Sequence, residues 1–342
     1  MAQRNGGALE VSSLAFLIAS LAVILFAATL FVNAVEWLGI RLSLSQGATG
    51  SVLAAVGTAL PESLIPAVAI LFGRDGFRHE VGIGAILGAP LMLATLAMAL
   101  TGLSLFFYSR GGGRSGFISA DYGHIQQQLT FFLWVYSLAI ILALLPLGDL
   151  RYAAAIGFVF AYMVFVRSVV RSGLKVEAHG IGPLRFAPRQ KEPALWLIAS
   201  QLIVSLALLL GGAHLFVEAV SDISHALGIS ALVLSLIIAP IATELPEKFN
   251  SIIWIGQRKD TLALGNITGA MAFQSTIPVA IGIAFTPWRF ETVALVAAIL
   301  ALLAAALLWL VFARRRRKVG ATALVTAGLP YLGFVAYIVV LA

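Results

Sequence analysis

Residues 57–62 read Gly-Thr-Ala-Leu-Pro-Glu, and residues 242–247 read Ala-Thr-Glu-Leu-Pro-Glu. Shifting the sequence by 185 residues aligns Leu30–Glu62 with Leu215–Glu247 without a gap, and about 12 of the 33 aligned residues are identical. A further match places residues 84–89 over residues 265–270, with a shorter loop in the second copy. The chain therefore contains an internal repeat, and each copy carries Leu-Pro-Glu inside an apolar segment.

The composition places both copies in a membrane. The 342 residues are 61% hydrophobic and only 11% charged, and the mean hydropathy is +1.01, whereas soluble domains contain about 25% charged residues. The chain has no cysteine, which excludes disulfides, thiolate metal sites and a cysteine nucleophile. These values exclude a cytoplasmic enzyme, a secreted disulfide scaffold and a disordered regulator. They predict a polytopic membrane protein.

Ten stretches have the length of about 20 apolar residues that a helix needs to cross a bilayer. The stretches are continuous rather than alternating, which favours helices over barrel strands. The polar segment 171–193 is interpreted as a cytoplasmic linker between two five-helix repeats, residues 1–170 and 194–342. The repeated motifs fall near 47–107 and 229–285. The predicted spans cover residues 13–34, 47–72, 81–107, 129–147, 151–170, 194–217, 229–255, 261–285, 291–312 and 320–341.

The distribution of Lys and Arg predicts the orientation. If every span crosses once, about 16 basic residues lie on the side of the linker and about 5 lie on the other side. Such an excess marks the cytoplasm, so both termini are expected outside the plasma (inner) membrane. The basic run Arg314–Lys318 is interpreted as a juxtamembrane anchor rather than a nucleic-acid site. The first span belongs to the repeat and is expected to be retained rather than cleaved as a signal peptide.

The two copies begin five spans apart. Because five is an odd number, the copies enter the membrane in opposite directions. Inverted repeats of this kind are typical of secondary transporters, whose binding site lies near the midplane where the copies meet. No nucleotide-binding loop is recognisable in the sequence, which excludes a single-chain primary pump.

Each repeat places a glutamate, Glu62 or Glu247, inside a predicted span. An ionised carboxylate there costs several kcal/mol unless it is paired or bound to a cation. Pro61 and Pro246 precede the glutamates, and each removes an amide donor and frees backbone carbonyls by breaking the helix. Carbonyl and carboxylate oxygens suit Ca²⁺ or Na⁺, whereas transition metals prefer His or Cys. The structural alternative is that both glutamates pair with fixed cations at helix kinks.

These motifs resemble the two repeats of the cation/Ca²⁺ exchanger superfamily, the sodium/calcium exchangers. That family's pattern is Gly-Thr-Ser-x-Pro-Glu followed by Gly-Asn-x-x-Gly-Ser-Asn. The resemblance covers nearly the whole chain and implies an all-α fold of ten transmembrane helices in a 5+5 inverted repeat. It implies alternating access, in which the first and sixth helices slide past the other eight. It also implies that Glu62 and Glu247 are the central cation ligands and that Thr58 and Thr243 contribute oxygens.

The resemblance implies no catalysis and no cofactor beyond the transported ions, Ca²⁺ with Na⁺ or H⁺. The expected partners are inorganic cations and the lipid bilayer, with no nucleic acid and no obligate protein partner.

The sequence departs from the family pattern at most of the secondary oxygen ligands. The serine after each threonine is replaced by Ala59 in the first copy and by Glu244 in the second. The later polar ligand of each repeat corresponds to Leu93 and to Gln274. The Gly-Ser-Asn segments read Gly-Ala-Pro at residues 88–90 and Gly-Ala-Met at residues 269–271. A site with four cation positions is therefore not expected to be intact.

The second copy also gains charged residues. Glu244 adds a third carboxylate, and Lys248 follows it four residues later, in the favourable order for an intrahelical ion pair. Lys248 either neutralises Glu244 alone, or it reaches Glu247 or the site itself and occupies the place of a cation. The second arrangement would make transport independent of one sodium ion, or would couple it to protons through shifted carboxylate pKa values.

These observations predict a secondary active antiporter that exchanges Ca²⁺ or a related cation for Na⁺. One alternative keeps the fold and couples transport to protons, and another is a non-transporting scaffold or sensor with a decayed ion site. An intramembrane hydrolase using Ser115 is disfavoured, because Ser115 lies in a Gly/Arg-rich loop without a partner histidine. His214, the only histidine well inside a predicted span, is interpreted as a packing or proton-sensitive residue.

Overall fold

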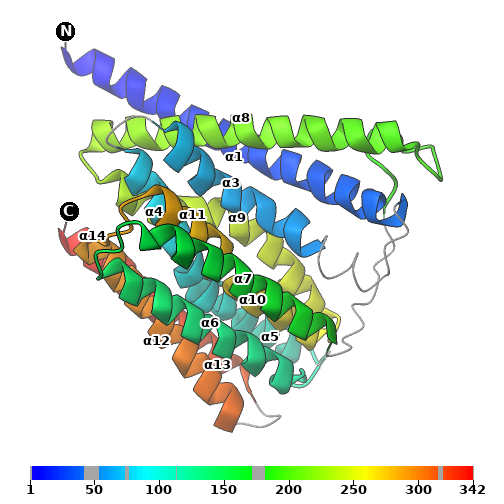
Figure 1. The fold of residues 1–342 in the computed structure, drawn as a ribbon. Helices are drawn as coiled ribbons and strands as arrows, with labels where there is room; N and C mark the ends of the chain where they lie inside the picture. The colour runs from blue at the N-terminus through cyan, green and yellow to red at the C-terminus, as the bar shows by residue number, and fades with distance from the viewer. Residues whose placement is uncertain are drawn as a thin grey trace.

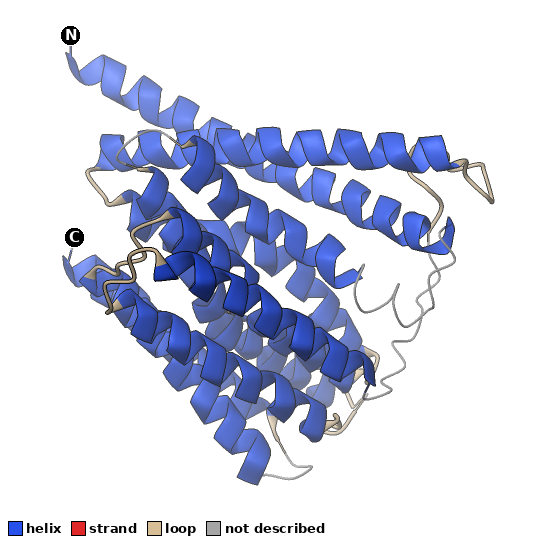
Figure 2. Ribbon diagram, viewed as in Figure 1, coloured by secondary structure: helices blue, strands red, loops and turns tan. Residues whose placement is uncertain are grey.

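The structure is a computed structural model that describes residues 2–41, 54–73, 77–112, 114–171, 182–314 and 319–341. Within these helices, the side chains of residues 2–12, 54–61, 170–171, 242, 245–247 and 341 lie outside the description. The described residues form helices joined by loops and no strand, and one antiparallel bridge links Phe117 with Gly320 (Figure 2).

Each of the ten ranges predicted to span the membrane contains a helix or a run of consecutive helices. Eight helical stretches in the described part are long and apolar enough to cross a bilayer, so the number ten remains a prediction. The elements are α1 (Ala2–Arg41), α3 (Ala54–Phe72), α4 (Arg78–Met92), the π-helical turn η2 (Leu93–Ala97), α5 (Met98–Arg110), α6 (Tyr122–Ala143), α7 (Leu150–Arg171), α8 (Leu195–Leu227), α9 (Ala231–Gly256), α10 (Asp260–Gln274), α11 (Ile277–Phe285), α12 (Thr292–Arg314), α13 (Ala321–Val325), the 3₁₀ turn η3 (Thr326–Gly328) and α14 (Leu329–Leu341).

Helix α6 begins earlier than the sequence predicts. The expected span starts at residue 129, but the helix starts at Tyr122, because the Asp121 side chain accepts a hydrogen bond from the backbone N–H of His124 at 3.1 Å. Such a cap satisfies an amide that the helix cannot pair internally. The polar residues 122–128 therefore belong to the helix rather than to the preceding loop.

Helices α1 and α8 lie side by side along one side of the molecule, and the remaining helices form a bundle beside them (Figure 1). Their interface is closely packed, since a Cβ atom added to Gly212 would lie 2.9 Å from Cγ1 of Ile24. Small residues at helix contacts allow this approach in membrane proteins. The two first helices of the repeats thus form a pair that also packs against α3.

The second half of the predicted linker is attached to this pair. Asn33 of α1 donates to the carbonyls of Gly182 and Pro183 at 3.4 Å, and its Oδ1 accepts from the N–H of Arg185 at 3.1 Å. Gln201 of α8 donates to Asn33 Oδ1 at 3.0 Å, which joins the two helices directly. A small buried cluster adds apolar contact, and it contains Leu184, Ala187 and Ile198. Residues 172–181 of the linker lie outside the described residues.

Glycines bring α4 and α9 together in the bundle. A Cβ atom added to Gly84 would lie 2.5 Å from the carbonyl oxygen of Leu232, and one added to Gly88 would lie 2.1 Å from that of Leu236. Any side chain at these positions would push the two helices apart. The close approach fixes the first repeat against the second, next to the segment of α9 that carries the repeated motif.

Candidate ion-binding site

A buried polar cluster joins α3, α9 and α10. The amide nitrogen Nε2 of Gln274 donates to Oε2 of Glu62 at 2.6 Å and to Oε1 of Glu244 at 2.8 Å. The exposed fractions are 7% for Glu62, 0% for Glu244 and 1% for Gln274. One amide group therefore connects two carboxylates that come from different repeats and are separated by 182 residues in the chain.

Lys248 completes the cluster on the side of Glu244. Its Nζ lies 3.4 Å from Oε2 of Glu244, one helical turn earlier on α9, and both side chains are buried. Glu244 thus directs one oxygen toward Gln274 and the other toward Lys248. The ion pair of Lys248 with Glu244 is present in the structure. The side chain of Glu247 lies outside the described residues, so the reach of Lys248 toward Glu247 remains a prediction.

The register of α9 explains why these groups meet. Glu244, Lys248 and Ser251 recur at helical spacing and are all buried, so they form one polar stripe along the helix. Ser251 donates to the carbonyl of Ala263 in α10 at 3.1 Å, and Asn266 of α10 donates to Ser251 at 3.4 Å. The polar stripe of α9 therefore faces α10, the helix that ends at Gln274.

The structure describes the side chains of only some of the other predicted ligands. Thr243 is buried, and its hydroxyl donates to the carbonyl of Ala239 at 2.9 Å, which leaves its oxygen lone pairs as acceptors. The side chains of Thr58, Pro61, Pro246 and Glu247 lie outside the described residues. Their assignment as ligands or helix breakers remains a prediction.

The helices α3 and α9 do not end at the two prolines. Helix α3 extends from Ala54 to Phe72 and α9 from Ala231 to Gly256, so both continue past their Pro-Glu pairs. The irregular backbone occurs in the next helix of each repeat instead.

The two irregular segments lie at equivalent positions. Leu93 begins the π-helical turn of the first repeat, and the aligned Gln274 is the last residue of α10 in the second. Thr276 then leaves the helical region with φ −123° and ψ −76°, and α11 restarts with Pro278 in its first turn. Bulges and breaks of this kind are frequent at functional sites in membrane helices. The break places the end of α10, and with it Gln274, beside the carboxylates.

A second buried polar contact near α10 was not predicted from the sequence. The hydroxyl of Thr268 donates to Oε1 of Gln128, and Nε2 of Gln128 lies 2.9 Å from Nε2 of His124. Gln128 escaped notice because the predicted span began one residue after it. A glutamine at helical spacing from apolar residues 125, 129 and 132 was the available signal.

The Gly/Arg-rich loop that contains Ser115 has a structural role. Arg114 donates to both carboxylate oxygens of Asp260, at 2.8 and 2.7 Å, and the N–H of Ser119 donates to the same carboxylate at 2.7 Å. Arg114 and Asp260 are both buried, and such bidentate pairs are the strong ones. The Ser115 hydroxyl accepts from the N–H of Phe117 at 3.1 Å. The loop therefore holds the start of α10.

His214 lies on α8 with 51% of its side chain exposed. Its Nε2 is 3.7 Å from Oε1 of Glu218, one turn later. Half of the side chain therefore packs against other groups, and the interpretation of His214 as a packing or proton-sensitive residue remains a prediction. Asn33, aligned with Glu218 in the first repeat, instead binds the linker and α8.

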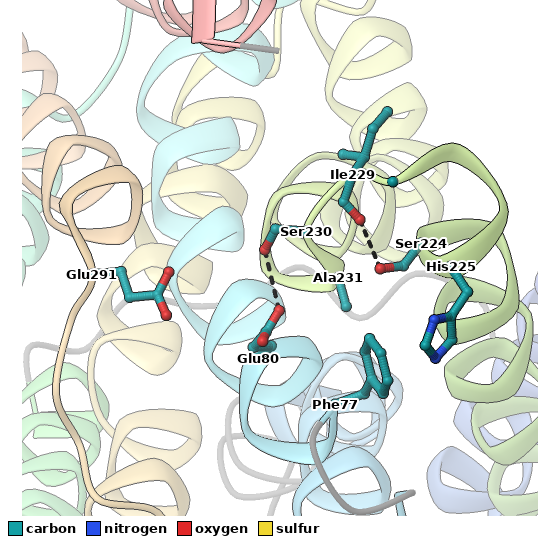
Figure 3. Close-up of a pocket in the computed structure, with 9 residues that line it drawn as sticks. Phe77, Glu80, Ser224, His225, Ile229, Ser230, Ala231 and Glu291 are labelled. Carbon is teal, nitrogen blue, oxygen red and sulfur yellow. Dashed lines mark hydrogen bonds between the residues drawn. The ribbon is translucent and has the colours of Figure 1, made fainter.

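A pocket of about 390 Å³ lies where α4 begins and α8 passes into α9, and Glu62, Glu244 and Gln274 do not line it (Figure 3). Oε2 of Glu80 accepts from the Ser230 hydroxyl at 3.1 Å and from the N–H of Leu232 at 3.4 Å. An acidic group at a helix N-terminus pairs free amides and complements the helix dipole. Glu80 is therefore a cap for α9.

Comparisons with known proteins agree with this architecture. The family model described as sodium/calcium exchanger protein matches residues 12–170 and 197–342. A protein named CaxA from Alkalimonas amylolytica is 25% identical over 282 residues, which is 82% of each chain. The fold is similar to the crystal structure of the H⁺/Ca²⁺ exchanger CAX, with a TM-score of 0.73 and 16% identity over 96% of this chain and 86% of that one. It is also similar to the sodium–calcium exchanger NCX_Mj, with a TM-score of 0.59 and 20% identity over 96% of this chain and 98% of that one. The predicted fold class is confirmed.

Proposed function

Because the chain belongs to the sodium/calcium exchanger protein family, we propose that it exchanges Ca²⁺ or a related cation for Na⁺ across the plasma membrane by alternating access. The protein is a multi-pass membrane antiporter for cations and not an enzyme. Its work consists of binding and releasing ions on alternate sides, with no covalent step.

The observation that carries the proposal is the bridge from Glu62 through Gln274 to Glu244. Buried carboxylates in a membrane protein are retained at a cost, and they mark ion pathways. A carboxylate has about four lone-pair sites, so one amide hydrogen does not saturate it. Carboxylate oxygens suit a hard cation such as Ca²⁺ or Na⁺. Gln274 also has a carbonyl oxygen beside its amide nitrogen, so rotation about its last torsion replaces a donor by an oxygen ligand.

The motif assigns the remaining ligands. We assign Glu247 as the counterpart of Glu62, and Thr58 and Thr243 as sources of further oxygens. Thr243 supports this assignment, because its hydroxyl hydrogen is already used by the carbonyl of Ala239 and its oxygen can only accept. The proposed site thus draws on α3, α9 and α10, which belong to both repeats.

Access to this site requires a moving element, since Glu62, Glu244 and Gln274 are buried. We assign that movement to α1 and α8. These helices are joined by the Asn33–Gln201 hydrogen bond and share the linker segment 182–187, so they move as one unit. They also pack against α3, which carries Glu62. A shift of the pair along α3 opens the site to one side of the membrane or to the other.

Proton coupling is the second candidate function. The first repeat supplies Ala59, Ala89 and Leu93 where the family pattern has polar ligands. A Na⁺ ion needs several oxygen ligands, whereas a proton needs a single carboxylate oxygen. The lost ligands are the observation that supports this second candidate, with Glu62 and Glu247 as the proton carriers.

Uptake of ⁴⁵Ca²⁺ into proteoliposomes separates these candidates. We expect uptake when the vesicles contain high Na⁺, and background uptake with a pH gradient alone or with no gradient. Glu62→Gln should reduce uptake to background, whereas the exposed linker residue Glu192 provides the matched control Glu192→Gln. Uptake driven only by pH would establish proton coupling. A folded protein without uptake under any gradient would support the scaffold or sensor.

A further inference from the structure

We propose that Lys248 is a permanent, built-in monovalent cation of the ion site. The carrier then exchanges one divalent cation for two monovalent cations and moves no net charge across the membrane. This inference rests on the proposed function and adds its stoichiometry.

The position of Lys248 supports a permanent role. Its ammonium group is buried and lies 3.4 Å from Oε2 of Glu244, whose other oxygen accepts from Gln274. Glu244 and Lys248 belong to the same helix, one turn apart, so relative movement of helices does not separate them. Glu62, by contrast, reaches Gln274 across a contact between α3 and α10. The ion pair therefore persists through the transport cycle, whereas the contacts of Glu62 are free to change.

The two repeats differ in charge at two aligned positions of the motif. At the position of Glu244 the first repeat has Ala59, and at the position of Lys248 it has Ser63. The second repeat thus carries one additional negative charge and one additional positive charge, and these two cancel. The remaining charge of the motif consists of Glu62 and Glu247, which together carry two negative charges.

A net charge inside the membrane is costly, and the cost sets the number of transported ions. Two negative charges are balanced by one divalent cation or by two monovalent cations. A third monovalent cation would leave one uncompensated positive charge, because the negative charge of Glu244 is already balanced by Lys248. Both loaded forms of the site are therefore neutral, and the exchange is expected to be insensitive to the membrane potential.

The first measurement is the steady-state Ca²⁺ accumulation ratio in proteoliposomes whose potential is set with K⁺ and valinomycin. A carrier that moves one net charge per cycle would change this ratio about 50-fold for each 100 mV. We expect a change of less than about 2-fold for the wild-type protein. Exchange that follows the potential would overturn the inference and leave the proposed function intact. Absence of exchange under both gradients would overturn the proposed function itself.

The second measurement is the Ca²⁺ concentration that gives half-maximal uptake. Glu244→Gln leaves the ammonium of Lys248 to oppose Ca²⁺, so this concentration should rise about 100-fold. The double variant Glu244→Gln with Lys248→Gln removes both charges and should lower this concentration at least about 10-fold relative to the single variant. The exposed Lys191 supplies the control Lys191→Gln, which should not change the concentration.

Equal loss in the single and the double variant would overturn the role of Lys248 as a cation. If Glu244→Gln does not fold, the double variant still tests the inference, because it removes the negative and the positive charge together. The accumulation ratio that its remaining uptake produces should be independent of the membrane potential. A double variant that responds to the potential would contradict the charge count.

Discussion

In the first repeat, Leu93 is buried in the hydrophobic core and begins the π-helical turn between α4 and α5. In the second repeat, the equivalent Gln274 ends α10 and holds Glu62 and Glu244 with one amide group. The two copies therefore interrupt the same helix at the same position but place opposite chemistry there. The polar groups of the described cluster come mainly from the second copy, and Glu62 is the contribution of the first.

This difference separates two properties of an inverted repeat. The interruption of the helix persists in the first copy, where no polar side chain takes the place of Gln274, so the backbone irregularity does not depend on the ligand. The chemistry is concentrated in the second copy, which holds Glu244, Lys248 and Gln274. A duplicated scaffold can therefore support a site that is no longer symmetric.

The largest expected effect on Ca²⁺ uptake comes from replacing Glu62, the residue that the first repeat contributes to the cluster. Glu62→Gln replaces a buried carboxylate by a neutral amide, and it turns one acceptor of the Gln274 hydrogen bond into a group that also donates. In the proposed site Glu62 binds the cation, and removing one member of such a buried charge pair costs about 2–5 kcal/mol, so we expect the uptake of ⁴⁵Ca²⁺ to fall about 100-fold or more.

Glu247→Gln should have an effect of the same size if the two motif glutamates are equivalent ligands. Thermal unfolding in detergent must show that both variants are folded. Exchange near the wild-type rate in Glu62→Gln would contradict the role of the first repeat in the site.

The second prediction concerns Gln274 of the second repeat, which is replaced by leucine, the residue at the aligned position 93 of the first repeat. Gln274→Leu removes the donor that serves both carboxylates, and an unsatisfied buried acceptor costs about 1–3 kcal/mol. We expect the Ca²⁺ concentration for half-maximal uptake to rise about 10- to 100-fold. The matched control is Leu93→Met in the first repeat, which conserves volume and should cost less than about 1.5 kcal/mol of stability without a change in Ca²⁺ dependence. Equal Ca²⁺ dependence in both variants would mean that the asymmetry has no functional effect.

Much of the fold was predictable from the sequence for a physical reason. A helix that crosses a bilayer must be apolar over most of its length, so the spans are visible in the hydropathy, and the shared Leu-Pro-Glu reveals the repeat. Helices α3 and α9 continue past Pro61 and Pro246, as the predicted spans 47–72 and 229–255 do. Loss of one amide donor does not outweigh the packing of the rest of a buried helix.

The contacts of the site were less accessible to sequence reasoning. Glu244 and Lys248 lie one turn apart, so their pairing follows from helical spacing alone. The bridge from Gln274 to Glu62 joins residues 212 positions apart and depends on how α10 ends beside α3. The attachment of the linker to Asn33 likewise depends on tertiary structure, because a Pro-rich polar segment gives no sign of its binding partner.

The third prediction compares the first helices of the two repeats. Asn33 of α1 binds the linker and Gln201, whereas the aligned Glu218 of α8 pairs with His214 at a partly exposed position. Asn33→Leu removes the hydrogen bonds of Asn33 to the exposed linker residues and to the buried Gln201, and should lower stability by about 1–3 kcal/mol. Glu218→Gln should change it by less than about 0.5 kcal/mol. Thermal unfolding in detergent measures both, and equal shifts would contradict the structural role of the linker contact.

The smallest expected effect concerns the irregular segments that the two repeats share. Thr95 donates to the carbonyl of Leu91, and the aligned Thr276 donates to the carbonyl of Ala272 at 3.1 Å. Valine has nearly the same shape as threonine, so Thr95→Val and Thr276→Val each remove one hydroxyl and should lower stability by about 1 kcal/mol. Because neither hydroxyl contacts Glu62 or Glu244 in the structure, both variants should retain Ca²⁺ exchange. A loss of exchange in Thr276→Val alone, at equal stability, would extend the asymmetry of the site from Gln274 to the break in the helix itself.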